Sequence, residues 1–116
     1  MEARTIRVYW RNVQAGWLNY NWNGVIYPDS VVHVSACEAQ IAEGRILGDW
    51  RKNASRYRGD AVVGVKNICP HGPNADDPNH PTGGVQFYVE ITNHRGPINV
   101  VTDITVMGGP EDVELV

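Results

Sequence analysis

The sequence predicts an all-β fold, a single antiparallel two-layer β-sandwich of jelly-roll type that spans residues 1–116. The length is that of one ordinary domain, and a composition with 42% apolar and 20% charged residues is globular. Apolar and polar side chains alternate along several short segments, which is typical of strands with one buried and one solvated face. Twelve glycines and seven prolines supply residues for the turns between these segments.

Three strands are predicted in the first two thirds of the chain. Residues 4–10 alternate apolar with polar side chains, so that alternate residues share one face. Residues 31–36 are rich in β-branched side chains and follow a Pro-Asp-Ser turn, and residues 60–68 show a similar strand pattern. These segments supply about half of the predicted sandwich.

Two further strands are predicted in the last third of the chain, at residues 84–92 and 98–107. The inward residues of the first are Val85, Phe87, Val89 and Ile91. The inward residues of the second are Ile98, Val100, Thr102, Ile104 and Val106. Only residues 93–97 join the two segments, and they contain a Gly-Pro pair, so the sequence predicts that the two strands form a hairpin.

Residues 38–52 depart from the strand pattern. Ala42, Ile46 and Trp50 follow one another at helical spacing, while two intervening glycines weaken a continuous helix. The sequence therefore predicts either one short helix or an irregular crossover within residues 38–52.

Charge and composition exclude some classes of partner. The net charge of −3 disfavours a nucleic-acid surface, which needs clustered Lys and Arg side chains. No apolar run is long enough for a transmembrane segment, and no secretory signal precedes the first strand, so we expect a soluble protein that is cytoplasmic or exported without a cleaved signal. Cys37 and Cys69 are then expected to be reduced, with a single disulfide between them as the alternative.

Aromatic and amide side chains are concentrated near the N-terminus, where six of the ten aromatic residues lie between positions 9 and 27. Aromatic faces pack against the C–H faces of sugar rings, and asparagine amides both donate hydrogen bonds to hydroxyl groups and accept them. Tyr20 and Trp22 are the expected stacking surfaces. The alternative is that these aromatics belong to the core and that Asn-Gly forms a turn. The candidate ligand-binding residues are Trp17, Asn19, Tyr20, Asn21, Trp22 and Asn23.

The segment 69–84 is predicted to be a long, shaped loop because it contains four prolines and no apolar period. Asp76 and Asp77, together with Asn74 and Asn79, offer the hard oxygen ligands that Ca²⁺ prefers. A second reading combines an aspartate with two histidines to hold Zn²⁺ or another transition metal. A plain solvated loop is the third reading. The two histidines are His71 and His80.

The leading functional hypothesis is a non-enzymatic, lectin-like carbohydrate-binding protein with a glycan or another small polar ligand as its partner. No catalytic motif is present, so no catalytic residue is assigned. Weak single sugar sites gain avidity when several are joined, which predicts a homo-oligomer. One alternative is a self-assembling structural protein with Tyr9, Tyr88 and Val101 in its subunit interface, and another is a small metal-dependent barrel enzyme.

Overall fold

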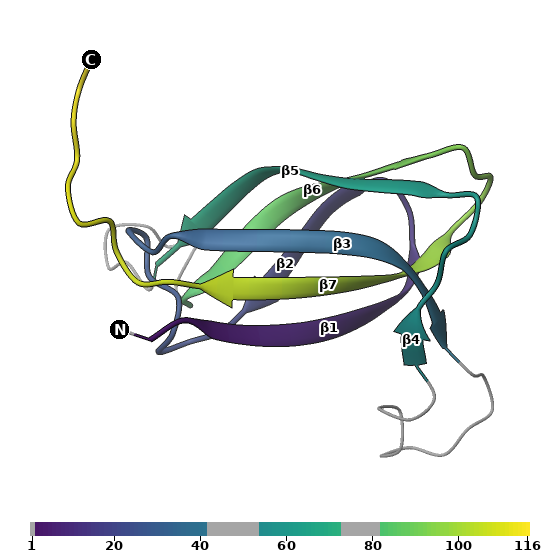
Figure 1. The fold of residues 1–116 in the computed structure, drawn as a ribbon, viewed down its shortest axis with the longest axis horizontal. Helices are drawn as coiled ribbons and strands as arrows, with labels where there is room; N and C mark the ends of the chain where they lie inside the picture. The colour runs from purple at the N-terminus through teal and green to yellow at the C-terminus, as the bar shows by residue number, and fades with distance from the viewer. Residues whose placement is uncertain (1, 42–53, 73–81) are drawn as a thin grey trace.

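The computed structural model describes residues 2–41, 54–72 and 82–116 (Figure 1). These residues form seven strands and no helix, and therefore no helix long and apolar enough to cross a membrane. In chain order the strands are β1 (Arg4–Val13), β2 (Gly16–Asn21), β3 (Val32–Ile41), β4 (Ala54–Arg56), β5 (Val62–His71), β6 (Gly84–Thr92) and β7 (Ile98–Val106).

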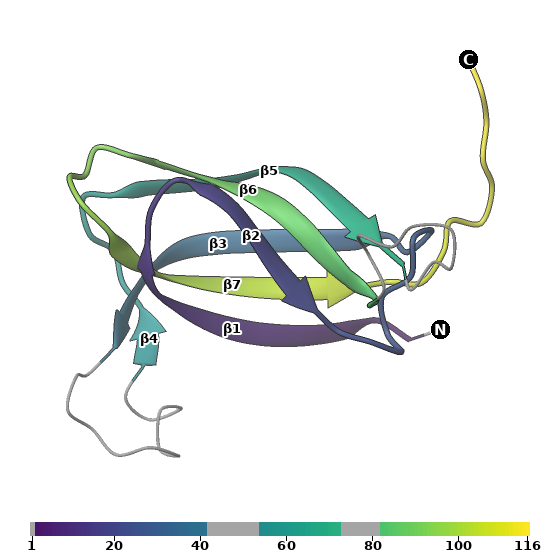
Figure 2. The same cartoon turned by 180° about the vertical axis from the view of Figure 1, so that it is seen from behind.

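The strands form two antiparallel sheets that pack face to face. One sheet has four strands in the order β1-β7-β3-β4, and the other has three in the order β2-β6-β5. Figure 1 shows the four-stranded sheet in front, and Figure 2 shows the three-stranded sheet in front. The predicted all-β, two-layer antiparallel sandwich is confirmed.

The core lies between the sheets and is built from the alternation seen in the sequence. The inward side chains of β6 and β7 form its centre, and among the described residues Phe87 is the largest fully buried side chain. Thr102 is also fully buried, and its hydroxyl accepts a hydrogen bond from Trp10 Nε1 at 2.9 Å. A buried polar group with a partner avoids most of the cost of desolvation, which explains how a threonine occupies an inward position.

The predicted hairpin between the last two strands is wrong. β6 pairs with β2 and β5, whereas β7 pairs with β1 and β3 in the other sheet. Residues 93–97 therefore cross from one sheet to the other. β6 and β7 each have a continuous apolar face. Since the two strands lie in different sheets, these faces oppose each other across the core, where both are buried.

The helix considered within residues 38–52 is excluded at its beginning. Glu38–Ile41 completes β3, and Ala39–Ile41 pairs with Arg56–Ala54 of β4. Residues 42–52 lie outside the described part of the chain. The β3–β4 pairing was not predicted, because β4 is only three residues long and has no alternation of its own.

The prediction that Val101 contributes to an exposed interface is wrong. Val101 points away from the sandwich core, yet only 2% of it is exposed. The β3–β4 pair reaches over this outer face: Tyr9 Oη donates a hydrogen bond to the carbonyl of Ala54 at 3.3 Å, and Arg56 forms an ion pair with Asp103. Val101 is therefore buried and offers no surface to a partner.

Candidate functional site

The alternation of β2 divides the predicted aromatic and amide cluster between two environments. Trp17, Asn19 and Asn21 are exposed on the outer face of the three-stranded sheet. Tyr20 and Trp22 are partly buried and pack against the hydrophobic core. The cluster is therefore one exposed row of side chains backed by a partly buried row.

The partly buried aromatics have defined partners. The ring centroids of Tyr20 and Trp22 lie 6.4 Å apart in an edge-to-face arrangement, and Tyr20 is also 6.4 Å from Trp10. The guanidinium of Arg4 lies over the Trp22 ring, 5.5 Å from its centroid. These contacts give both aromatics a role in packing and fix their positions behind the exposed row.

Asn23 follows β2 in a tight turn. The backbone N–H groups of Val25 and Ile26 both donate to the carbonyl of Trp22, and Gly24 adopts a φ of 81°. Glycine tolerates this left-handed conformation without a steric penalty. Asn23 Oδ1 accepts a hydrogen bond from the N–H of Gly83 at 3.4 Å, so Asn23 ties the turn to the start of β6.

Trp17 forms the aromatic end of the exposed row. It is 58% exposed, and its ring lies edge to face with Tyr88, its register partner on β6, at a centroid distance of 5.6 Å. On the other side of Tyr88 lies Lys66 of β5, which forms an ion pair with Glu90. The hydrogen bond to Glu90 raises the pKa of Lys66, so the ammonium stays charged and engaged beside the aromatic pair.

A short hydrogen-bond chain forms the polar end of the row. The amide nitrogen of Asn19 donates to Asn21 Oδ1 at 2.8 Å. Asn19 Oδ1 is therefore the acceptor for His71 Nε2, which lies 2.7 Å away. The chain joins β2 to β5 across β6, and it holds both asparagine side chains in fixed orientations.

Gly84 makes this crossing possible. It lies on β6 between its register partners Asn21 and His71. A Cβ atom at this position would lie 2.6 Å from the carbonyl oxygen of Tyr20, 2.9 Å from Asn21 Oδ1 and 2.9 Å from His71 Cε1. The absence of a side chain lets β2 and β5 approach across the outer face.

A β-bulge places His71 on the outer face. The register of β5 against β6 shifts between Lys66 and Cys69, and Asn67 in the bulge has a φ of 51°. A bulge adds one residue to a strand and reverses which face the following side chains occupy. Without it, His71 would have the same parity as Val65, which packs against the core.

The observed strands also correct the predicted boundaries of the long loop. Residues 69–71 belong to β5 and residue 84 begins β6, so the predicted loop 69–84 is shorter than expected. The prediction ended the strand at residue 68 because the apolar pattern stops there and a Cys-Pro pair follows. Asn67 is the signal that indicates a bulge followed by more strand, because asparagine adopts the left-handed conformation of a bulge more readily than most residues.

The proposed metal ligands cannot be placed together. Asn74, Asp76, Asp77, Asn79 and His80 lie outside the described residues, and the calcium and transition-metal readings remain predictions. His71 is described, and its ring is engaged with Asn19. Among the residues that the structure places, no group of three or more His, Cys, Asp or Glu side chains could hold a metal ion.

Both cysteines are free thiols, as the sequence predicts. Cys37 lies on β3 beside Val101, and Cys69 lies on β5 beside Gln86, so the two belong to different sheets. The sulfur of Cys69 contacts the carbonyl of Pro70 at 3.9 Å, while the His71 ring is directed to Asn19. The placement of Cys69 and His71 near each other in sequence therefore does not produce a thiol–imidazole pair.

No protein-family model, curated protein or solved structure matches this chain. The candidate site is accordingly defined by its geometry alone. We call it the outer strip, a continuous set of side chains on the exposed face of the three-stranded sheet. It consists of Trp17, Asn19 and Asn21 of β2, Gln86 and Tyr88 of β6, and His71 of β5.

Proposed function

We propose that the chain is a non-enzymatic, lectin-like protein that binds glycans along the outer strip. The observation that carries the proposal is the exposed Trp17, held edge to face by Tyr88, at the end of a row of hydrogen-bonded amides. An exposed tryptophan beside oriented amides presents a stacking surface and polar partners on one face of the molecule. Sugar rings require both of these features.

The geometry favours a preorganised site. Tyr88 fixes the orientation of the Trp17 ring, and the chain from His71 to Asn21 fixes the amide groups. Side chains that are already ordered lose less conformational entropy when a ligand binds. The partly buried aromatics Tyr20 and Trp22 support the strip from behind and are not required as stacking surfaces in this proposal.

The dimensions favour an oligosaccharide as ligand. Residues two apart on a strand lie about 7 Å apart, so the strip extends roughly 13 Å from Trp17 to Asn21. A ligand of several linked rings would stack on Trp17 at one end and bond to Asn19, Asn21 and Gln86 further along. Each of these contacts is weak, so we also propose that the protein acts as a homo-oligomer with several sites.

The experiment is a glycan array followed by titration calorimetry of the best ligand with wild-type protein and with Trp17→Ala. We expect Trp17→Ala to weaken binding at least tenfold, since loss of one stacking contact removes about 1.4 kcal/mol or more. Its melting temperature should stay close to that of wild type because the side chain is largely exposed.

Tyr27→Ala is the matched control. Tyr27 is a 45% exposed aromatic in the segment between β2 and β3, outside the strip. Its removal should leave glycan affinity unchanged. The proposal fails if the wild type binds no glycan, or if Trp17→Ala and Tyr27→Ala bind the same ligand equally well.

A further inference from the structure

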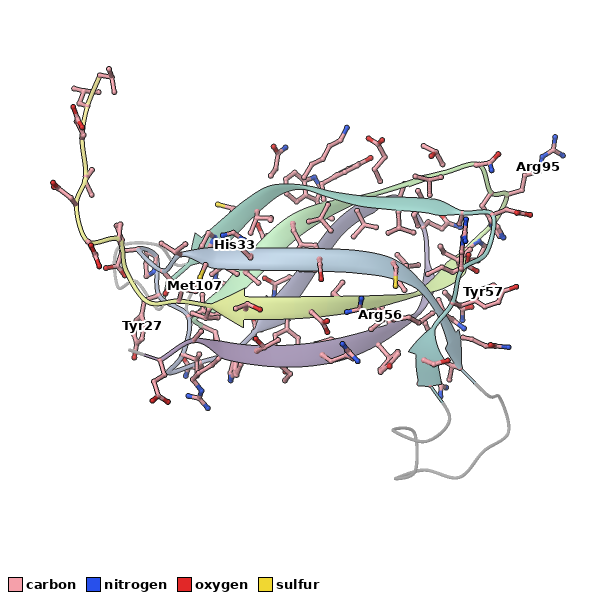
Figure 3. All side chains as sticks on the ribbon, viewed as in Figure 1. Tyr27, His33, Arg56, Tyr57, Arg95 and Met107 are labelled. Atoms are coloured by element: carbon pink, nitrogen blue, oxygen red, sulfur yellow. The ribbon has the colours of Figure 1, made fainter. Side chains whose placement is uncertain are left out.

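A cavity lies at the end of the sandwich where β4 leads into β5. It has a volume of about 390 Å³. Apolar walls come from Ala61 and Val63, both of which also pack against the core. Figure 3 shows Arg56 and Tyr57 at this end of the molecule, away from Tyr27 and Met107. The remaining lining residues are Cys37, Glu38, Arg58 and Gly59.

Glu38 gives this cavity its chemical character. It pairs with Val100 on β7 and therefore points toward the inside of the sandwich. Its Oε1 atom is buried and has no hydrogen-bond partner among the residues that the structure describes. A buried acceptor without a donor is unfavourable for folding, so such a group in a native structure requires an explanation.

Gly59 leaves the space that the carboxylate occupies. A Cβ atom at residue 59 would collide with Glu38 Oε1 and would lie 2.8 Å from Tyr57 Cε2. The 57–61 segment thus packs closely against Oε1, while Glu38 itself is one of the residues that line the cavity. The cavity wall therefore contains a carboxylate of which only Oε1 is buried without a partner among the described residues, so a ligand in the cavity can donate to its other oxygen.

The rim of the cavity carries the opposite charge. Arg56 is already bonded to the carboxylate of Asp103, whereas Arg58 is an exposed lining residue. A ligand that binds both Glu38 and Arg58 needs a cationic donor for the carboxylate and an anionic group for the guanidinium. Beside these two groups, the apolar walls of Ala61 and Val63 accommodate a small hydrocarbon side chain.

We propose that this cavity binds a small zwitterion, a free α-amino acid, with its ammonium group on Glu38 and its carboxylate on Arg58. The site lies on β3 and the β4–β5 connection, and it shares no residue with the outer strip. It is therefore a binding function additional to the proposed glycan site and does not depend on it.

The test is ligand-observed NMR and titration calorimetry of the full chain with each of the free L-amino acids. At least one should bind saturably at micromolar to millimolar concentration. Its N-acetyl derivative, which lacks the ammonium, and its amide, which lacks the carboxylate, should each bind at least tenfold more weakly. If no amino acid binds, or if both derivatives bind as well as the parent, the proposal is overturned.

Two variants assign the binding to this cavity. Glu38→Gln and Arg58→Gln should each weaken binding of that amino acid at least tenfold, while Arg95→Gln, an exposed arginine outside the cavity, should have no effect. Unchanged affinity in Glu38→Gln would overturn the assignment.

The melting temperature of Glu38→Gln distinguishes a binding role of Glu38 from a structural role. Because Oε1 has no hydrogen-bond partner among the described residues, Glu38→Gln should melt at the same temperature as wild type or higher. A clear fall in the melting temperature of Glu38→Gln would show that the carboxylate stabilises the fold and would overturn the proposal. Glycan binding should be unchanged in this variant.

Discussion

Gly84 is the position where the smallest change should have the clearest effect on the candidate site. In Gly84→Ala the new methyl group would lie 2.6 Å from the carbonyl oxygen of Tyr20. Ordinary contacts begin near 3.4 Å, so the backbone of β2 must move by about 0.8 Å. Asn21 and His71 must also turn away, since each has an atom 2.9 Å from the methyl position.

Overpacking of this kind costs about 1–3 kcal/mol. For a domain of this size that corresponds to a melting temperature lower by roughly 5–15 °C. The same movement breaks the contact between His71 and Asn19, so glycan affinity should fall as well. Thermal unfolding followed by circular dichroism measures the first effect, and calorimetry with the glycan measures the second.

Gly64→Ala is the control for this experiment. Gly64 lies on β5 beside Glu90, on the same outer face, and a Cβ atom there would meet nothing within 4 Å. Alanine is favoured over glycine inside a strand, so this variant should be as stable as wild type or slightly more stable. If Gly84→Ala has the same melting temperature as Gly64→Ala and binds glycan normally, the described hydrogen-bond chain from β2 to β5 across β6 is incorrect.

Three further predictions concern the core, an ion pair and the thiols. Phe87→Ala should destabilise the domain by about 3–5 kcal/mol because it empties the centre of the core, and a melting temperature within a degree or two of wild type would contradict this. Arg7 holds the pKa of Asp103 below its usual value, so the ion pair stabilises the fold fully above the unfolded-state pKa, and this stabilisation is lost as the pH falls through the folded-state pKa. Asp103→Asn should therefore lose less stability than wild type between neutral and acidic pH. Parallel pH profiles of the two proteins would refute the assignment. Without reductant, Cys69 should react with a thiol reagent in the folded protein faster than the less exposed Cys37, and both should react after unfolding.

The strands that form the core could be predicted because alternation records burial directly. The inward residues predicted for β6 and β7 all lie in the core or pack against it. Pairing between strands was harder to predict, because alternation shows which face is buried and does not show which strand is adjacent. The predicted β6–β7 hairpin failed for this reason, since a five-residue connection can close a hairpin or cross between sheets.

The candidate site could be predicted only in part. Trp17, Asn19 and Asn21 were among the predicted residues because aromatic and amide side chains alternate along one short segment. Gln86, Tyr88 and His71 come from strands far away in sequence, and only the pairing of β2, β6 and β5 brings them together. His71 further depends on the bulge at Asn67, which the apolar pattern does not show.

The most direct test of the glycan-binding proposal is the tryptophan indole region of an ¹⁵N–¹H NMR spectrum during titration with the glycan selected on the array. The chain has four tryptophans, and the exposed Trp17 lies in a different environment from Trp10. The signal of Trp17 should shift progressively to saturation, together with the side-chain amides of Asn19 and Asn21. The signal of Trp10, whose indole N–H is bonded to Thr102 in the core, should stay in place. Shifts confined to residues outside the outer strip, or no shift at Trp17 at a saturating glycan concentration, would contradict the proposal.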